Sequence, residues 1–89
     1  MDALEYATEN MYRLAWKLER GDYLTVYRHR KYPDMQMIEY SKTDYQMYRE
    51  HKYWLNKGFL RRRVFDLHEE RKKIDPNYRA KRRRVTKGA

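Results

Sequence analysis

The sequence contains no cysteine, which removes disulfide bridges and thiolate metal ligands from consideration. Three glycines and two prolines occur in 89 residues, and the glycines are too dispersed to form a phosphate-binding loop. No run approaches the ~20 apolar residues of a membrane-spanning helix. The acidic start, with Asp2 and Glu5, resembles neither a secretory signal nor an arginine-rich transit peptide.

Side chains that commonly carry catalysis are equally scarce. Ser41 is the only serine, and its neighbours form no nucleophile motif. The three histidines, His29, His51 and His68, lack the spacing of a metal-binding helix. We therefore expect no catalytic residue, metal site, cofactor or small-molecule substrate.

Strict core-forming residues are few, and aromatic residues replace them. Leucine, isoleucine, valine and phenylalanine supply 14 of 89 residues, below the ~20% at which highly charged chains tend to disorder. Ten tyrosines and two tryptophans provide apolar bodies with polar tips, a composition typical of protein interfaces. The residues predicted to contact neighbouring proteins are Trp16, Tyr23, Tyr27, Tyr45, Tyr48 and Trp54.

Three helices are predicted from capping residues and apolar spacing. Asp2 and Glu5 form a capping box at the start of residues 3–20, where apolar residues recur at steps of three and four. The stripe consists of Leu4, Ala7, Met11, Leu14 and Leu18. Further helices are expected over 42–57 and 60–74, the last ended by Asp75-Pro76. We expect the first stripe to pack on the second helix.

The segments between these helices are expected to carry little regular structure. Residues 22–33 are rich in β-forming side chains but too short for a sheet, so any strand partner would come from another protein. Residues 35–40 are expected to form a short helical turn. The predicted fold class is therefore all-α: two to three short helices around a thin aromatic-rich core (residues 1–76), then an extended basic tail (residues 77–89).

The net charge of +9 is concentrated in the last third of the chain. Residues 61–89 contain twelve Lys or Arg against four Asp or Glu, which gives +8. So concentrated a field indicates a polyanionic partner, and RNA is the commonest one in a cell. Two other interpretations of the tail stay open: a nuclear-import signal, and a solvated charged segment with no partner.

Three basic clusters are candidates for phosphate contacts. Arginine predominates, and its guanidinium binds phosphate in a bidentate manner and stacks on unpaired bases. The first cluster alternates with aromatic residues, although core packing of those tyrosines is an alternative interpretation. The second falls in the first turn of the predicted third helix, where the dipole disfavours cations, which suggests an external anion. A solvated face is the alternative interpretation of this cluster. The predicted RNA-binding residues are Arg28, Arg30, Lys31, Arg61, Arg62, Arg63, Arg79, Lys81, Arg82, Arg83, Arg84 and Lys87.

The order of features also resembles a known family. Its residues here are Glu5-Tyr6-Ala7 with Met11, Arg13 and Leu14; Tyr32-Pro33; Gly58-Phe59-Leu60-Arg61; Asp66, Glu69, Glu70, Arg71 and Lys72; and the tail from Arg79 to Lys87. In this order they resemble the mitochondrion-specific small-subunit ribosomal proteins of family thirty-three. The resemblance implies a non-catalytic structural subunit of the mitochondrial small ribosomal subunit, located in the matrix and bound to rRNA and neighbouring proteins.

Two alternative functions stay open. The run Met47-Tyr48-Arg49-Glu50-His51 is similar to segments of small accessory subunits of respiratory complex I, which would make the protein a structural subunit of a respiratory-chain complex. There the basic tail would lie against anionic lipid headgroups. The other alternative is a small basic nuclear or viral nucleic-acid-binding protein.

Overall fold

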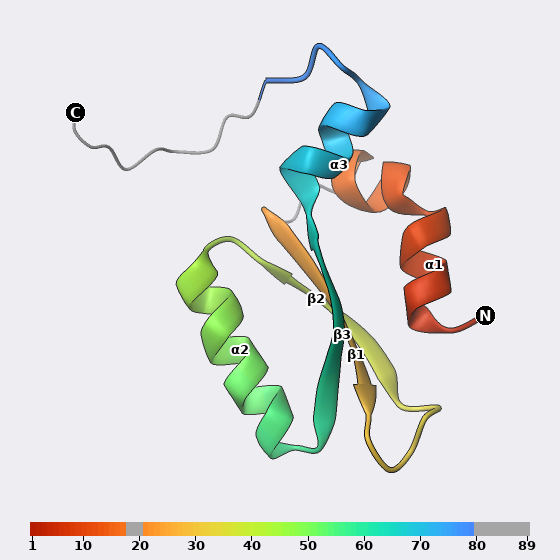
Figure 1. The fold of residues 1–89 in the computed structure, drawn as a ribbon, viewed down its shortest axis with the longest axis vertical. Helices are drawn as coiled ribbons and strands as arrows, with labels where there is room; N and C mark the ends of the chain where they lie inside the picture. Colours follow the sequence, from red (N-terminus) through yellow and green to blue (C-terminus); the bar gives the residue numbers. More distant parts are fainter. Residues whose placement is uncertain (18–20, 80–89) are drawn as a thin grey trace.

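An antiparallel sheet forms the centre of the molecule in a computed structural model, which describes residues 1–17 and 21–79 (Figure 1). The elements in chain order are α1 (Ala3–Glu9), the π-helical turn η1 (Arg13–Lys17), β1 (Tyr23–His29), β2 (Gln36–Ser41), α2 (Asp44–Asn56), β3 (Phe59–Asp66) and α3 (Leu67–Ile74). The strand order is β2-β1-β3, and both outer strands run antiparallel to β1. Therefore β2 and β3 run in the same direction, and α2 connects them.

The predicted all-α fold class is wrong, because the chain forms a three-stranded sheet with helices on both faces. The β-forming segment does become β1, but it pairs with β2 and β3 of the same chain instead of another protein. A strand, β2, replaces the short helical turn expected at residues 35–40. The predicted third helix is divided into β3 and α3.

The error over β3 has a physical cause. Leu60, Val64 and Leu67 are spaced as on one side of a helix, and this spacing suggested helix 60–74. The ladder between β1 and β3 contains a bulge at Arg62, which interrupts the two-residue alternation by which a strand is recognised. A bulged strand with exposed arginines therefore lacks the sequence signal of a regular strand.

The other predicted helices fare better. The second is confirmed as α2, which begins after Thr43, whose hydroxyl accepts a hydrogen bond from the Gln46 amide at 3.0 Å. The capping box of Asp2 and Glu5 is confirmed at the start of α1. However, α1 ends at Glu9 and is followed by η1, while the remainder of the prediction, residues 18–20, lies outside the described residues.

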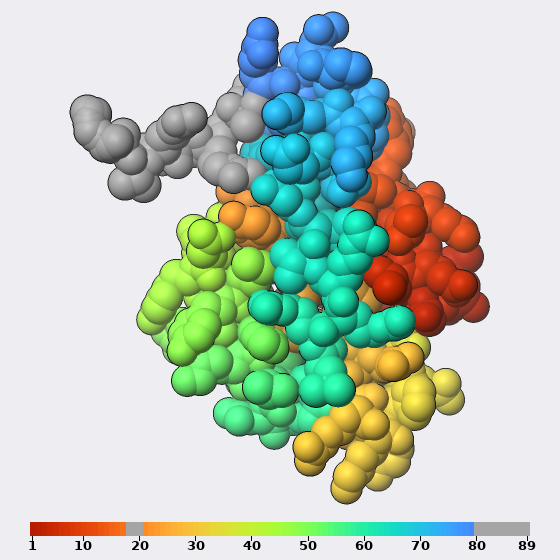
Figure 2. All heavy atoms as spheres, in the orientation of Figure 1, coloured from red at the N-terminus to blue at the C-terminus, as the bar shows by residue number. Residues whose placement is uncertain are grey.

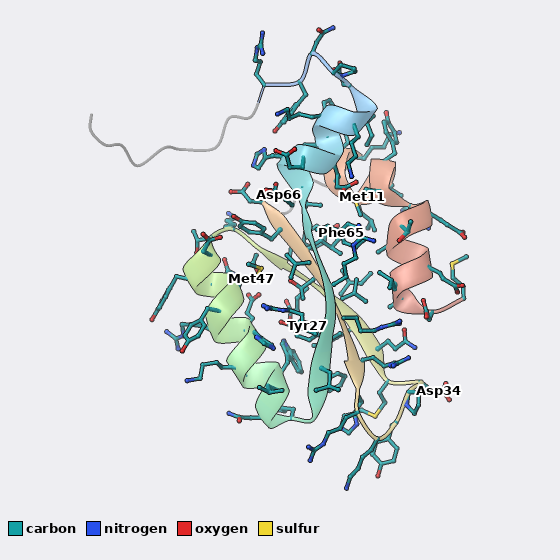
Figure 3. All side chains as sticks on the ribbon, viewed as in Figure 1. Met11, Tyr27, Asp34, Met47, Phe65 and Asp66 are labelled. Carbon is teal, nitrogen blue, oxygen red and sulfur yellow. The ribbon has the colours of Figure 1, made fainter. Side chains whose placement is uncertain are left out.

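One face of the sheet packs on α1 and η1 and holds the apolar core. Leu24 and Val26 are fully buried there, with Phe65 beside them on β3. Ala7 and Met11 cover them from the helical side, and Figure 3 shows Met11 and Phe65 on this side of the sheet. The predicted packing of the first stripe on the second helix is therefore wrong, because α1 and α2 lie on opposite faces (Figure 1).

The opposite face packs on α2 through polar and aromatic side chains. Tyr27 is fully buried, and its ring centroid lies 6.4 Å from that of His51. Trp54 Nε1 donates to Glu39 Oε2 at 3.2 Å. In Figure 3, Tyr27 and Met47 lie between the sheet and α2. No α2 residue is buried, whereas Ala7 of α1 and Leu14 and Ala15 of η1 are buried on the other face.

A buried polar cluster attaches α3 to the rest of the fold at the end opposite the β1–β2 hairpin (Figure 1). The ring of His68 bridges Asp22 Oδ1 at 2.8 Å and the Tyr78 hydroxyl at 2.7 Å. Arg71 donates to the same hydroxyl at 3.2 Å and also to the carbonyl of Ala15. Contacts with the body thus continue to Tyr78, beyond the predicted boundary after residue 76.

Candidate nucleic-acid interface

The β1–β2 hairpin loop and the turn between α2 and β3 meet at one end of the molecule. The Arg30 amide donates to the Gly58 carbonyl at 2.8 Å, joining the two turns. Gly58 has a φ of 92°, and a Cβ at this position would lie 2.5 Å from His29 Nε2. Only glycine suits this left-handed turn and this close approach.

His29 shapes the hairpin loop. Its Nδ1 accepts hydrogen bonds from the backbone amides of Lys31 at 3.0 Å and Tyr32 at 3.3 Å. Its ring lies 5.1 Å from that of Tyr32 and 5.0 Å, edge to face, from that of Phe59. The loop that carries the exposed Arg30 and Lys31 side chains is therefore fixed to β3 by aromatic contacts.

A β-bulge separates the three consecutive arginines. Val26 pairs with Arg63, whereas the next residue, Tyr27, pairs with Arg61, so Arg62 is an additional residue in β3. Paired residues in an antiparallel ladder share a face, so Arg61 lies on the α2 face with Tyr27 and Arg63 on the α1 face with Val26. The bulge thus spreads positive charge over both faces at this edge of the sheet.

The contacts of the other two arginines agree with this division. Arg62 donates to Asp2 Oδ2 at 3.1 Å, at the start of α1. The Arg63 guanidinium lies 4.4 Å from the centroid of the Phe65 ring, a cation–π contact. The predicted position of the three arginines in a helical first turn is wrong, because they belong to β3 and face no helix dipole.

Two of the predicted basic clusters come together on this surface. Arg28 is exposed and lies one residue beyond Tyr27 on β1, opposite Leu60 of β3. Figure 2 shows β3 between α2 and α1, with the hairpin below. We call the exposed cations of this region the basic surface: Arg28, Arg30, Lys31, Lys57, Arg61, Arg62 and Arg63.

Sequence reasoning missed two contributors to the basic surface. Lys57 joins it because it caps the end of α2 and directly precedes Gly58. Only the position of this turn places the lysine beside the hairpin. From the sequence, His29 stands out only as a histidine without metal-site spacing, whereas its structural role is to hold the loop. Its position between cations offered a signal, because an imidazole can accept hydrogen bonds that a cation cannot.

The third predicted cluster lies elsewhere. Arg79 is exposed and follows Tyr78, which contacts α3 at the end of the molecule opposite the hairpin. The remaining predicted residues lie outside the described residues: Lys81, Arg82, Arg83, Arg84 and Lys87. The described structure thus places only Arg79 of this cluster, and it lies apart from the basic surface.

The residues predicted to contact other proteins occupy several environments. Tyr27 is fully buried on β1, between the sheet and α2. Its predicted contact with another protein is therefore wrong. Trp54 faces the sheet and is half-buried. Trp16 is half-buried with its ring edge-on to Tyr78 at 5.2 Å, and Tyr23 is half-buried on β1. Tyr45 and Tyr48 are exposed on the outer side of α2.

Burial under α2 favours the neutral forms of several ionisable groups. It raises the pKa of Tyr27 to about 12, despite the opposing charge of Arg61. Burial, and then the charge of Glu50, raises the pKa of Glu39. Burial, and then the charge of Arg61, lowers the pKa of His51. These shifts follow mainly from desolvation of groups that lie between the sheet and α2.

Other kinds of site find no support in the described ranges. Within residues 1–17 and 21–79, no group of three or more His, Asp or Glu residues could hold a metal ion. Over the same ranges, no helix has the length and apolar character needed to cross a membrane. The chain matches no family model, no curated protein and no solved structure. Function must therefore be inferred from the chemistry of the residues.

Proposed function

We propose that this protein is a non-catalytic RNA-binding structural subunit of a ribonucleoprotein particle. The supporting observation is the basic surface, where cations from two distant sequence segments, 28–31 and 57–63, are brought together by the hairpin and the bulged β3. Each Lys or Arg that contacts a phosphate releases condensed counterions, which favours binding at low salt. Contacts of this kind position the protein on RNA without reading its sequence.

For the particle we propose the mitochondrial small ribosomal subunit, and the mitochondrial matrix as the location. The support is the order of sequence features that resembles the ribosomal proteins of family thirty-three. The basic tail, residues 79–87, would add phosphate contacts of its own. The half-buried aromatic residues Trp16 and Tyr23 would contact neighbouring proteins of the particle.

The phosphate-binding role is tested by the salt dependence of RNA affinity. In the double variant Arg30→Gln/Arg61→Gln, one cation is removed from each segment, and the slope of log K against log salt should fall by about two. The matched control is Lys72→Gln/Lys73→Gln, which removes two exposed cations from α3 that already lie beside Glu69 and Glu70. Equal slopes for the two double variants would remove the basic surface from the mechanism.

Membership of the particle is tested by gradient sedimentation of the tagged protein from mitochondrial lysate, with and without RNase. Co-migration with small-subunit rRNA that is lost after RNase is expected. Co-migration with a detergent-solubilised respiratory complex that persists after RNase would overturn the proposal in favour of the accessory-subunit alternative.

A further inference from the structure

The outer side of α2 and its last turn carry three tyrosines and three cations. Positions three and four apart in a helix share one side, so these residues form a single face along its length. The three tyrosine side chains are 67%, 56% and 54% exposed in chain order. We call this surface the tyrosine–cation face: Tyr45, Tyr48, Arg49, Lys52, Tyr53 and Lys57.

Each tyrosine of this face has a cation over its ring, four residues further along the helix. The Arg49 guanidinium lies 5.8 Å from the ring centroid of Tyr45. The ammonium of Lys52 lies 5.5 Å from that of Tyr48, and Lys57 repeats this arrangement over the next tyrosine at 5.1 Å. Each cation therefore lies against a neutral ring, which does not cancel its charge, so the cation can still interact with an external anion.

The face has no carboxylate of its own between its first and last residues. The only acidic residue in 45–57 is Glu50, which turns towards the sheet and accepts hydrogen bonds from Ser41 and Gln46. Among the described residues, the cations found in ion pairs are Arg62, His68, Lys72 and Lys73, none of which belongs to this face. The face therefore has positive charge and exposed aromatic rings together.

We propose that the tyrosine–cation face binds an unpaired segment of RNA. This inference rests on the proposed RNA-binding function and specifies where on the protein single-stranded RNA is held. Bases stack on the exposed rings while the three cations contact phosphates. Unpaired RNA fits because its bases can expose their faces to a phenol ring, whereas a duplex hides them in its stack. From Tyr45 to Tyr53 the helix rises about 12 Å, enough for a few nucleotides.

The position of the face supports the same occupant. Its last residue, Lys57, also belongs to the basic surface, next to the Gly58 carbonyl that accepts from Arg30. An RNA strand that leaves α2 at Lys57 therefore reaches the hairpin cations directly. A protein partner would have to be strongly acidic along the whole helix to match this charge, while a polyanion matches it by its nature.

The test compares ring removal with ring retention. Tyr45→Ala/Tyr48→Ala/Tyr53→Ala keeps every charge and, since alanine favours helix, should keep the fold, which far-UV circular dichroism verifies. The probe is a fluorescent twelve-residue oligouridylate, measured by anisotropy beside an RNA duplex of the same length. We expect the alanine variant to bind the oligouridylate at least about tenfold more weakly, with an unchanged salt slope. The matched Tyr→Phe triple variant should stay within about twofold.

Each outcome separates this inference from the proposed function. If the full-length protein binds oligouridylate and the alanine variant binds it equally well, the tyrosine–cation face is not the site, although the RNA-binding function stands. Tighter binding of the duplex than of the single strand would also overturn the inference. If the alanine variant binds oligouridylate normally but leaves the particle in gradient sedimentation, the face binds a protein. If the full-length protein binds neither RNA at low salt, the proposed function itself fails.

Discussion

The two faces of the sheet differ in the polarity of their buried side chains. The face under α1 is apolar, with Leu24 and Val26 completely buried against helical residues. The face under α2 is polar, with the hydroxyls of Thr25 and Tyr27 buried and without a hydrogen-bond partner among the described residues. Alternate residues of one strand, β1, supply both faces. Leu24 and Val26 belong to the apolar core, whereas the unpaired hydroxyls of Thr25 and Tyr27 on the other face cost stability.

This contrast divides structural and functional roles between the faces. The apolar face gains free energy from burial. The polar face carries ionisable groups whose neutral forms are favoured by burial, and it supports the helix that presents the tyrosine–cation face. The RNA contacts proposed for the outer side of α2 are compatible with the absence of buried α2 residues on its inner side, because the apolar face provides the main stability.

The largest effect is expected from a leucine on the apolar face. Leu14→Ala should lower the free energy of unfolding by about 2–5 kcal/mol, because Leu14 is buried and its removal leaves a cavity. The matched control is Leu55→Ala on α2, where the side chain is 48% exposed and the change should stay within about 0.5 kcal/mol. Urea denaturation followed by circular dichroism measures both. Similar losses in the two variants would refute the contrast between the faces.

A gain in stability is expected on the polar face. Tyr27→Phe removes the buried hydroxyl that has no partner, and should raise the free energy of unfolding by about 1 kcal/mol. Tyr40→Phe serves as the control, since its hydroxyl donates to the Leu14 carbonyl at 3.2 Å and its loss should cost about 1 kcal/mol. Denaturant midpoints distinguish the stabilisation expected for Tyr27→Phe from the destabilisation expected for Tyr40→Phe. A destabilised Tyr27→Phe variant would mean that the hydroxyl is hydrogen-bonded in solution.

The smallest expected effect is a dependence of stability on pH. The pKa of Glu39 is raised above its usual value of 4.5 in the folded protein. Between pH 4.5 and the raised pKa, the folded state therefore retains a proton that the unfolded state has lost. The free energy of unfolding contributed by Glu39 therefore falls as pH rises from 4.5 through the raised pKa. The glutamine of Glu39→Gln cannot ionise and keeps an acceptor for Trp54, so this fall in the free energy of unfolding should disappear in the variant. The fall is expected to be smaller than the loss of stability in Leu14→Ala.

The measurement is the difference in urea midpoint between Glu39→Gln and the parent chain, from below pH 4.5 to neutrality. A difference is needed because His51 acts in the opposite direction. Its pKa is lowered from 6.5, so its own contribution to stability rises as pH increases towards 6.5. A midpoint difference that stays constant over the whole range would show that Glu39 ionises as freely in the folded protein as in the unfolded chain.

Part of the fold could be predicted from the sequence, namely where local signals are strong. The capping box at Asp2 and the 3.6-residue periodicity of residues 44–56 predicted the start of α1 and the whole of α2, because both signals depend on neighbouring residues. The strands could not be recognised in the same way. β2 is half-buried along most of its length, and β3 contains a bulge, so neither alternates clearly between apolar and polar residues.

The candidate site was predictable in composition but not in arrangement. The cations Arg28 and Arg61 are conspicuous in the sequence, yet their proximity depends on a strand pairing between segments far apart in the chain. Interface contacts are predicted for Tyr45 and Tyr48 but not for Tyr53, because the sequence does not show which side of a helix meets the sheet. Glu50 and Trp54 decide this, and their partners on β2 become known only in the fold.

The bulge in β3 has a consequence for self-association. β3 lies at an edge of the sheet, where unpaired backbone groups can recruit a strand from another molecule. An additional residue at Arg62 disturbs the regular spacing of these groups, and three successive arginines would face identical arginines in an antiparallel copy. Like charges and irregular spacing both oppose such pairing. The arginines proposed to contact a polyanion thus also disfavour edge-to-edge pairing of two copies.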